Sequence, residues 1–209
     1  MVDEAATPGK RAREIRDIVA VFVLSVTAVL TAWCGFEASK WGGEMSIAFS
    51  QASSARIQAG NYEGEARDAR QFDLTIYAEW VKADLAGDTA LATYIETRFL
   101  PDFAVAFDAW VEDGRQENSP LARSEYIPSG AVEADEWNAR ADEKFAEALV
   151  DNQRGDNYSL LTVLFALVLF LTAMSQRAAA SWANWTLLGL ALVAALVGIG
   201  VGMTFPIKI

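Results

Sequence analysis

The sequence predicts an all-α membrane protein with three transmembrane helices and a long antiparallel helical hairpin ectodomain capped by short helices. The first reason is that three densely apolar stretches lack Asp, Glu, Lys and Arg: 18–36, 158–175 and 182–203. A helix that crosses a bilayer needs about 20 such residues. The second reason is that residues 37–157 carry helical periodicity and no strand-period stretch of any length.

These observations divide the chain into seven expected segments. They are a cytoplasmic tail (1–16), transmembrane helix 1 (17–36), an extracytoplasmic helical domain (37–157), transmembrane helix 2 (158–175), a cytoplasmic link (176–181), transmembrane helix 3 (182–203) and a short extracytoplasmic tail (204–209). Residues 1–12 carry few apolar side chains and are expected to be a disordered tail.

Charge predicts the orientation. Lys10, Arg11, Arg13 and Arg16 precede the first span, and basic residues beside a span favour the cytoplasmic side. With the N-terminus inside, the segment 37–156, which holds 24 acidic and 11 basic residues, is expected outside, as is the C-terminus. The negative charge of this segment argues against nucleic-acid binding. The lipid bilayer is an expected partner because of the three apolar stretches.

The first span is interpreted as an uncleaved anchor. It is longer than the apolar region of a typical signal peptide, and no A-x-A-like cleavage site follows it. A lipoprotein site at Cys34 is disfavoured because the bulky Trp33 precedes it. Cys34 is the only cysteine, so no disulfide can form within the chain, and a small apolar filler is its simplest role.

A long helix follows the first span without a proline. Its apolar positions alternate by four and three residues, as in a coiled-coil seam: Trp41, Met45, Ala48, Ala52, Ala55, Ala59, Tyr62, Ala66 and Ala69. The alternative is an ordinary amphipathic helix with alanines chosen for helix propensity. At the start of this helix, Glu37 and Lys40 are spaced to form an ion pair.

The expected partner of this helix lies at 132–156. Small or aromatic residues recur there at helical spacing: Ala134, Trp137, Ala141, Phe145, Ala148 and Asn152. We therefore expect hairpin arms at 37–71 and 131–157. Residues 72–130 then form a distal helical cap and loop, in which Asp88 caps one helix, Pro101 opens another and the aromatic residues build a small core.

The third span carries small residues every four positions, at Ala194, Gly198 and Gly202. Such a face lets two membrane helices approach closely. It is expected to pack against another span of the chain or against another subunit. The predicted helix-packing interface therefore consists of Trp41, Met45, Ala48, Ala52, Ala55, Ala59, Ala66, Ala69, Ala194, Gly198 and Gly202.

The sequence contains few of the residue types and motifs that enzymes use for catalysis. It contains no histidine, which excludes Ser-His-Asp and Cys-His nucleophile systems and His-ligated metals. No Walker, dinucleotide or calcium-loop pattern is present, so no cofactor, metal site or enzyme activity is expected. A carboxylate pair remains an alternative, with candidates Glu79, Asp84, Asp102 and Asp108 among the cap aromatics. Helix capping and solvation explain these four more simply.

Three stretches carry a resemblance to a known family: 33–44 (WCGFEASKWGGE), 87–92 with 98–103 (GDTALA and RFLPDF) and 152–158 (NQRGDNY). Together they resemble an uncharacterised family of small bacterial three-span membrane proteins. The resemblance covers nearly the whole chain. It implies a bacterial origin, and hence the plasma membrane, together with the three-span layout, and it assigns no activity or site residue.

The sequence therefore favours a structural or accessory membrane subunit that forms a homo-oligomer or joins a larger membrane complex. An oligomeric channel or transporter is a second class, but the three spans carry no ionisable residue of the kind that marks a transport pathway. A membrane-tethered hydrolase using the cap carboxylates is a third.

Overall fold

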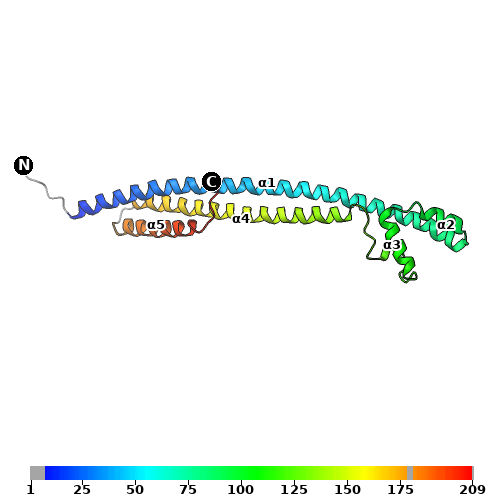
Figure 1. Cartoon of the computed structure of the whole chain (residues 1–209). Coiled ribbons are helices and arrows are strands. Elements are labelled where there is room, and N and C mark those ends of the chain that lie inside the picture. The colour runs from blue at the N-terminus through cyan, green and yellow to red at the C-terminus, as the bar shows by residue number, and fades with distance from the viewer. Residues whose placement is uncertain (1–7, 178–180, 209) are drawn as a thin grey trace, which may run out of the picture. The chain divides into compact units, whose positions relative to one another are not determined.

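The computed structural model describes residues 8–177 and 181–208, and these residues form helices and no strand. The elements are α1 (Pro8–Ala86), α2 (Thr89–Glu96), α3 (Pro101–Glu112), the 3₁₀ helix η1 (Pro120–Ala122), α4 (Ala131–Ser175) and α5 (Ser181–Gly202) (Figure 1). The all-α expectation is confirmed. Residues 1–7 of the predicted tail and half of the predicted link, 178–180, lie outside the described residues. Residues 8–12 were expected to be disordered, but they belong to α1.

Three helices, α1, α4 and α5, are long and apolar enough to cross a membrane, which confirms the expectation of three candidate spans. Local signals end the helices of the cap region. Gly87 follows the last residue of α1 and has a φ of +70°, a conformation that suits glycine because it has no Cβ. The Asp88 carboxylate then accepts a hydrogen bond from the Leu91 N–H and caps α2, and Pro101 opens α3.

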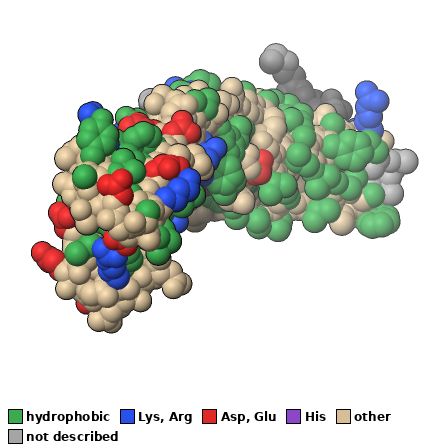
Figure 2. Space-filling view, turned by 90° about the vertical axis from the view of Figure 1, so that its right-hand side faces the viewer, with side chains coloured by type: hydrophobic (Ala, Val, Ile, Leu, Met, Phe, Trp, Pro, Cys, Tyr) green, Lys and Arg blue, Asp and Glu red, His purple; other side chains and the backbone are tan. Residues whose placement is uncertain are grey.

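The chain divides into two compact units, Met1–Ala48 with Ala146–Ile209 (the first unit) and Phe49–Phe145 (the second unit). In the first unit, parts of α1 and α4 pack with α5, and Figure 1 shows α5 alongside α4. Large apolar side chains also face outward there, including Phe22, Phe170 and Leu196. On the face drawn in Figure 2, one region of the surface is mainly hydrophobic, whereas acidic and basic side chains gather elsewhere.

The small-residue face of α5 packs against α4 of the same chain. A Cβ added at Gly198 would lie 2.8 Å from the Phe165 ring, and one at Gly202 would lie 3.3 Å from Leu161. Glycine is needed at the first of these positions because the ring occupies the space of a side chain. The sequence left open whether this face packs against another span of the chain or against another subunit. In the described residues it packs against α4.

In the second unit, α1 and α4 run side by side in opposite directions. The rings of Phe49 and Phe145 lie 5.5 Å apart, whereas the Ser129 hydroxyl, before α4 begins, donates to the Glu65 carboxylate at 3.0 Å. The buried residues between the helices are mostly alanines: Ala52, Ala55, Ala59, Ala134 and Ala141. Alanine allows close approach but buries little apolar area.

The end of α1 packs with α2, α3 and the following loop around an aromatic cluster in the second unit. Its buried members are Trp80, Ala83, Ala92, Ile95, Phe103, Ala106, Phe107, Trp110 and Tyr126. Several rings meet edge to face, such as Trp80 and Phe107 at 4.8 Å. Each such pair contributes about 0.5–1.5 kcal/mol beyond area burial.

Candidate functional site

The predicted interface residues lie inside contacts that the chain makes with itself. Trp41, Ala48, Ala52, Ala55 and Ala59 are between 1% and 7% exposed. Gly198 is also buried, and the other members are partly buried: Met45, Ala66, Ala69, Ala194 and Gly202. These side chains are therefore largely used by internal helix packing. A partner would have to contact other surfaces.

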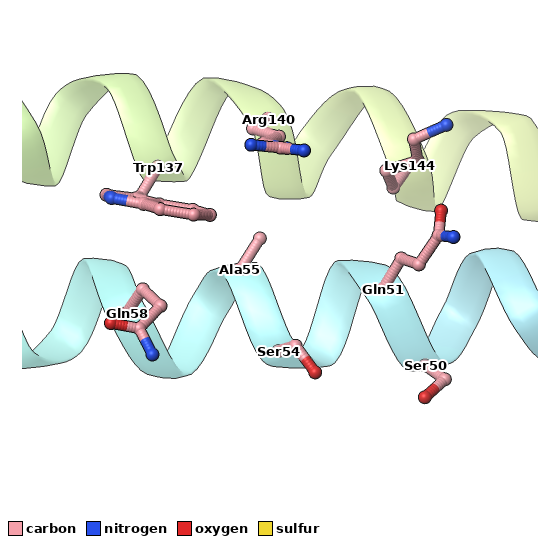
Figure 3. A pocket seen from close by; sticks show the side chains of 8 residues that line it. All are labelled: Ser50, Gln51, Ser54, Ala55, Gln58, Trp137, Arg140 and Lys144. Atoms are coloured by element: carbon pink, nitrogen blue, oxygen red, sulfur yellow. The ribbon is translucent and has the colours of Figure 1, made fainter.

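Beside the alanine seam of the second unit runs a groove of about 630 Å³ between α1 and α4. Its lining residues are Ser50, Gln51, Ser54, Ala55, Gln58, Trp137, Arg140 and Lys144. Figure 3 shows Trp137 and Arg140 on α4 and Ala55 on α1 facing one another across the groove. Because Ala55 has only a methyl group, the groove floor stays low while longer side chains form its rims.

The charge of this groove differs from that of its surroundings. The second unit holds 19 acidic and 9 basic residues, yet the groove is lined by two cations and no carboxylate. The Arg140 guanidinium lies 5.2 Å from the centre of the Trp137 ring, a cation–π arrangement. The groove is therefore suited to polar or acidic groups of a partner.

A second groove of about 350 Å³ in this unit is lined by Phe49, Ala52, Ser53, Arg56, Ala141 and Phe145. The Arg56 side chain at the rim of this groove is held in place because its guanidinium donates hydrogen bonds to Asn138 and to Asp142. Phe145 remains 48% exposed. This groove is thus more apolar than the first.

The four predicted cap carboxylates are all exposed, and two of them form ion pairs. Glu79 binds Lys82, Asp84 binds Arg115, and both ion pairs are exposed. Asp102 is exposed in the first turn of α3. Asp108 is exposed at the rim of a pocket of about 310 Å³ that also contains Trp80 and Arg115.

The carboxylate that the sequence analysis missed in this unit is Asp73, which is 1% exposed. Its Oδ2 accepts a hydrogen bond of 2.9 Å from the Tyr126 hydroxyl, whereas Oδ1 has no partner among the described residues. Burial raises the pKa of Asp73, the Tyr126 hydrogen bond lowers it, and the charge of Asp102 raises it. One signal was present: position 73 continues the four-and-three seam after Ala69.

In the first unit two carboxylates are buried, Asp151 on α4 and Glu37 on α1, and Glu37 is the one with no exposed surface. The predicted ion pair with Lys40 is not what engages it. Its Oε2 instead accepts a hydrogen bond of 2.9 Å from the backbone N–H of Lys208. Sequence spacing pointed to a local partner because residue i+3 is always within reach on a helix, whereas a partner 171 positions away depends on the tertiary fold.

Among the described residues, no group of three or more His, Cys, Asp or Glu side chains is arranged to hold a metal ion. Comparison with known proteins supplies no relative. No family model matches the chain, and no curated protein or solved structure matches it either.

Proposed function

We propose that this chain is an integral membrane structural or accessory subunit of the bacterial plasma membrane that acts through helix–helix association. Its partners are a second copy of the chain or a larger membrane complex. The proposal includes no catalysis, no cofactor and no nucleic-acid partner.

The observation that carries the proposal is the thin helix pair of the second unit. Two helices joined by Ala52, Ala55 and Ala141 bury little apolar area between them, and two grooves flank the seam. A further helix that packs into a groove adds the area that alanines lack, because side-chain ridges of one helix fit the grooves of others. The exposed Phe145 and Ile57 supply apolar surface for it.

The proposed topology puts the N-terminus in the cytoplasm and 37–157 outside, as a helical hairpin with a distal cap. This orientation is supported by the basic residues before the first span: Lys10, Arg11, Arg13 and Arg16. A single cysteine introduced as Gln116→Cys in a Cys34→Ser background tests it. We expect an impermeant thiol reagent to label this variant in intact cells, and labelling only after permeabilisation contradicts the topology.

Association is tested by the native mass of the full chain in detergent and in nanodiscs, together with its recovery from its own membrane. We expect a defined oligomer or a complex of fixed stoichiometry. The variant Ser54→Trp fills the polar groove and should dissociate it. Thr75→Trp is the matched control, since Thr75 is also an exposed hydroxyl residue of α1 but does not line the groove.

A monodisperse monomer that recovers no partner contradicts the proposal. Dissociation by both tryptophan variants assigns the effect to general disruption of the helix and not to the groove. Retention of the complex in both variants leaves association intact but excludes the polar groove as its surface.

A further inference from the structure

The polar groove of the second unit contains an exposed cation that the chain leaves without a carboxylate. Arg140 lies between Glu136 and Glu143 on α4, at spacings of four and three residues that commonly form ion pairs on a helix. Among the described residues none of these three side chains forms an ion pair. The Arg140 guanidinium instead lies over the Trp137 ring (Figure 3). It is therefore open to carboxylates of another molecule.

The two glutamates form an acidic stripe on a neighbouring face of α4. Successive residues of an α-helix are rotated by about 100°, so a position two residues after a seam alanine points away from the seam. Glu136 and Glu143 follow the buried Ala134 and Ala141 by two residues, and both glutamates are exposed. Arg140 precedes Ala141 by one residue and lies on the flank of the helix. The groove and the acidic stripe are thus two separate surfaces of one chain.

We propose that the polar groove binds the acidic stripe of a second copy of this chain, so that Glu136 and Glu143 of one copy contact Arg140 of the next. The inference rests on the proposed function and names the partner in that association. Charge complementarity supports it, because the described lining of the groove carries two cations and no carboxylate. The serine and glutamine side chains of α1 that line the groove are further hydrogen-bond donors for carboxylates.

Copies that share one bilayer hold these charges at matching heights. In the proposed topology every copy has the same orientation, so a given residue lies at the same distance from the membrane in each copy of a ring. The α4 helices of neighbouring copies then run in the same direction. Along α4, Arg140 lies about 6 Å from the level of Glu136 and about 4.5 Å from that of Glu143, at 1.5 Å per residue. Both glutamates of a neighbouring copy are therefore about one helical turn or less from the guanidinium in height.

This contact is head to tail and not two-fold. If two copies met through their grooves about a two-fold axis along the membrane normal, Arg140 of one copy would face Arg140 of the other, and like charges repel. Since the groove and the acidic stripe are different surfaces, each copy uses its groove towards one neighbour and its stripe towards the other. Such heterologous contacts form a ring where the rotation closes. The assembly therefore contains three or more copies.

The test measures the native mass of the full chain in detergent at several protein concentrations. We expect three or more copies for the wild type, with weaker association at high salt because salt screens exposed charges. Arg140→Glu places a negative charge opposite the acidic stripe and should raise the dissociation constant by about tenfold or more. Arg67→Glu is the matched control, because Arg67 is an exposed arginine of α1 that does not line the groove. It should change the dissociation constant by less than about threefold.

Reversing the acidic stripe provides a rescue. Glu136→Lys combined with Glu143→Lys makes the stripe basic and should also weaken the oligomer, because the stripe then faces the cations of the groove. Adding Arg140→Glu to this double variant restores opposite charges in every contact. We expect the triple variant to regain most of the wild-type association. Such a recovery shows that the weakened variants failed at the interface and not in folding.

The outcomes separate this inference from the proposed function. A monodisperse wild-type monomer that recovers no partner contradicts both. A wild-type dimer, a complex with a single copy of this chain, or an oligomer that Arg140→Glu leaves unchanged overturns the inference, while association itself stands. An equal loss in Arg67→Glu assigns the effect to net charge and overturns the role of the groove. A triple variant that stays dissociated overturns the pairing of Arg140 with the acidic stripe.

Discussion

Glu37 in the first unit and Asp73 in the second unit are both almost completely buried carboxylates, and they are held in different ways. Asp73 in the second unit is bonded to a tyrosine hydroxyl, and the Tyr126 ring belongs to the aromatic core, 6.0 Å from Phe103. Glu37 in the first unit is bonded to the backbone N–H of Lys208 in the segment 204–208. In both carboxylates the second oxygen has no partner among the described residues.

The comparison shows that buried carboxylates differ in how firmly the hydrogen-bond donor is held by its own surroundings. Tyr126 is fixed by surrounding rings, so the Asp73 bond is part of a packed core. The Lys208 N–H lies outside the helices, so the Glu37 bond instead joins the segment 204–208 to α1. The first bond is part of a packed aromatic core, whereas the second connects two segments that are far apart in the sequence.

The largest expected effect is loss of the ring that supports Tyr126. Phe103→Ala removes a fully buried side chain and should cost about 3–5 kcal/mol of unfolding free energy, because it leaves a cavity. Urea titration of the full chain, followed by tryptophan fluorescence, measures this. Leu85→Ala, at an 83% exposed position, should change it by less than about 0.5 kcal/mol. A similar cost for both variants argues against the packed core.

The next effect concerns the C-terminal segment. Glu37→Met removes the acceptor of the Lys208 N–H, and a hydrogen bond to a charged group contributes about 1.5–3 kcal/mol. Amide hydrogen exchange at Lys208 should therefore accelerate by about tenfold or more. Glu37→Gln retains a carbonyl oxygen and should preserve most of the protection. Unchanged exchange in Glu37→Met shows that other contacts hold the segment.

Tyr126→Phe tests the corresponding bond in the second unit. It removes the hydroxyl that donates to Asp73 and leaves both carboxylate oxygens buried without a partner among the described residues, at a cost of about 1–3 kcal/mol. The same urea titration measures it. In a Asp73→Asn background the cost should shrink, because the buried charge is gone. An equal cost in both backgrounds shows that the negative charge of Asp73 does not set the cost of losing the Tyr126 hydroxyl, because the amide oxygen of the Asp73→Asn variant can still accept its hydrogen bond.

The raised pKa of Asp73 gives a pH dependence with a defined sign. The folded protein holds this proton to higher pH than the unfolded chain, whose carboxyl titrates near the ordinary value of 3.8. Asp73 therefore lowers stability as pH rises from about 3.8 through its raised folded-state pKa. Asp73→Asn should remove this loss when unfolding is measured across that range. A wild-type protein and variant with parallel pH profiles contradict the assignment.

The smallest effect is expected for an exposed ion pair of the second unit. Asp142→Asn removes the charge that faces Arg56, and both side chains are more than half exposed. Solvent screening limits such pairs to about 1 kcal/mol or less. The urea midpoint should hardly move, in contrast with Tyr126→Phe. If Asp142→Asn lowers the free energy of unfolding as much as Tyr126→Phe does, the expected difference between buried and exposed carboxylates is wrong.

Much of the architecture was predictable because it depends on local patterns. Long apolar stretches without charge predicted three spans, and Asp88, Pro101 and Gly87 marked helix limits that depend on backbone geometry alone. The site residues were less predictable. Asp73 continues the seam pattern, but its polar side chain points to a solvated face until the aromatic core is seen around it. Glu37 had a plausible neighbour in Lys40, and only the fold brings Lys208 to it.

The sequence by itself determined the helical class, the three apolar helices and the absence of histidine chemistry, since composition and periodicity express these directly. Only the tertiary structure decided which face α5 offers to α4, where the seam alanines leave grooves, and which carboxylates are buried. The physical reason is that burial and hydrogen bonding depend on residues far apart in the chain. Glu37 and Lys208 are separated by 171 positions, yet one N–H and one carboxylate oxygen lie 2.9 Å apart.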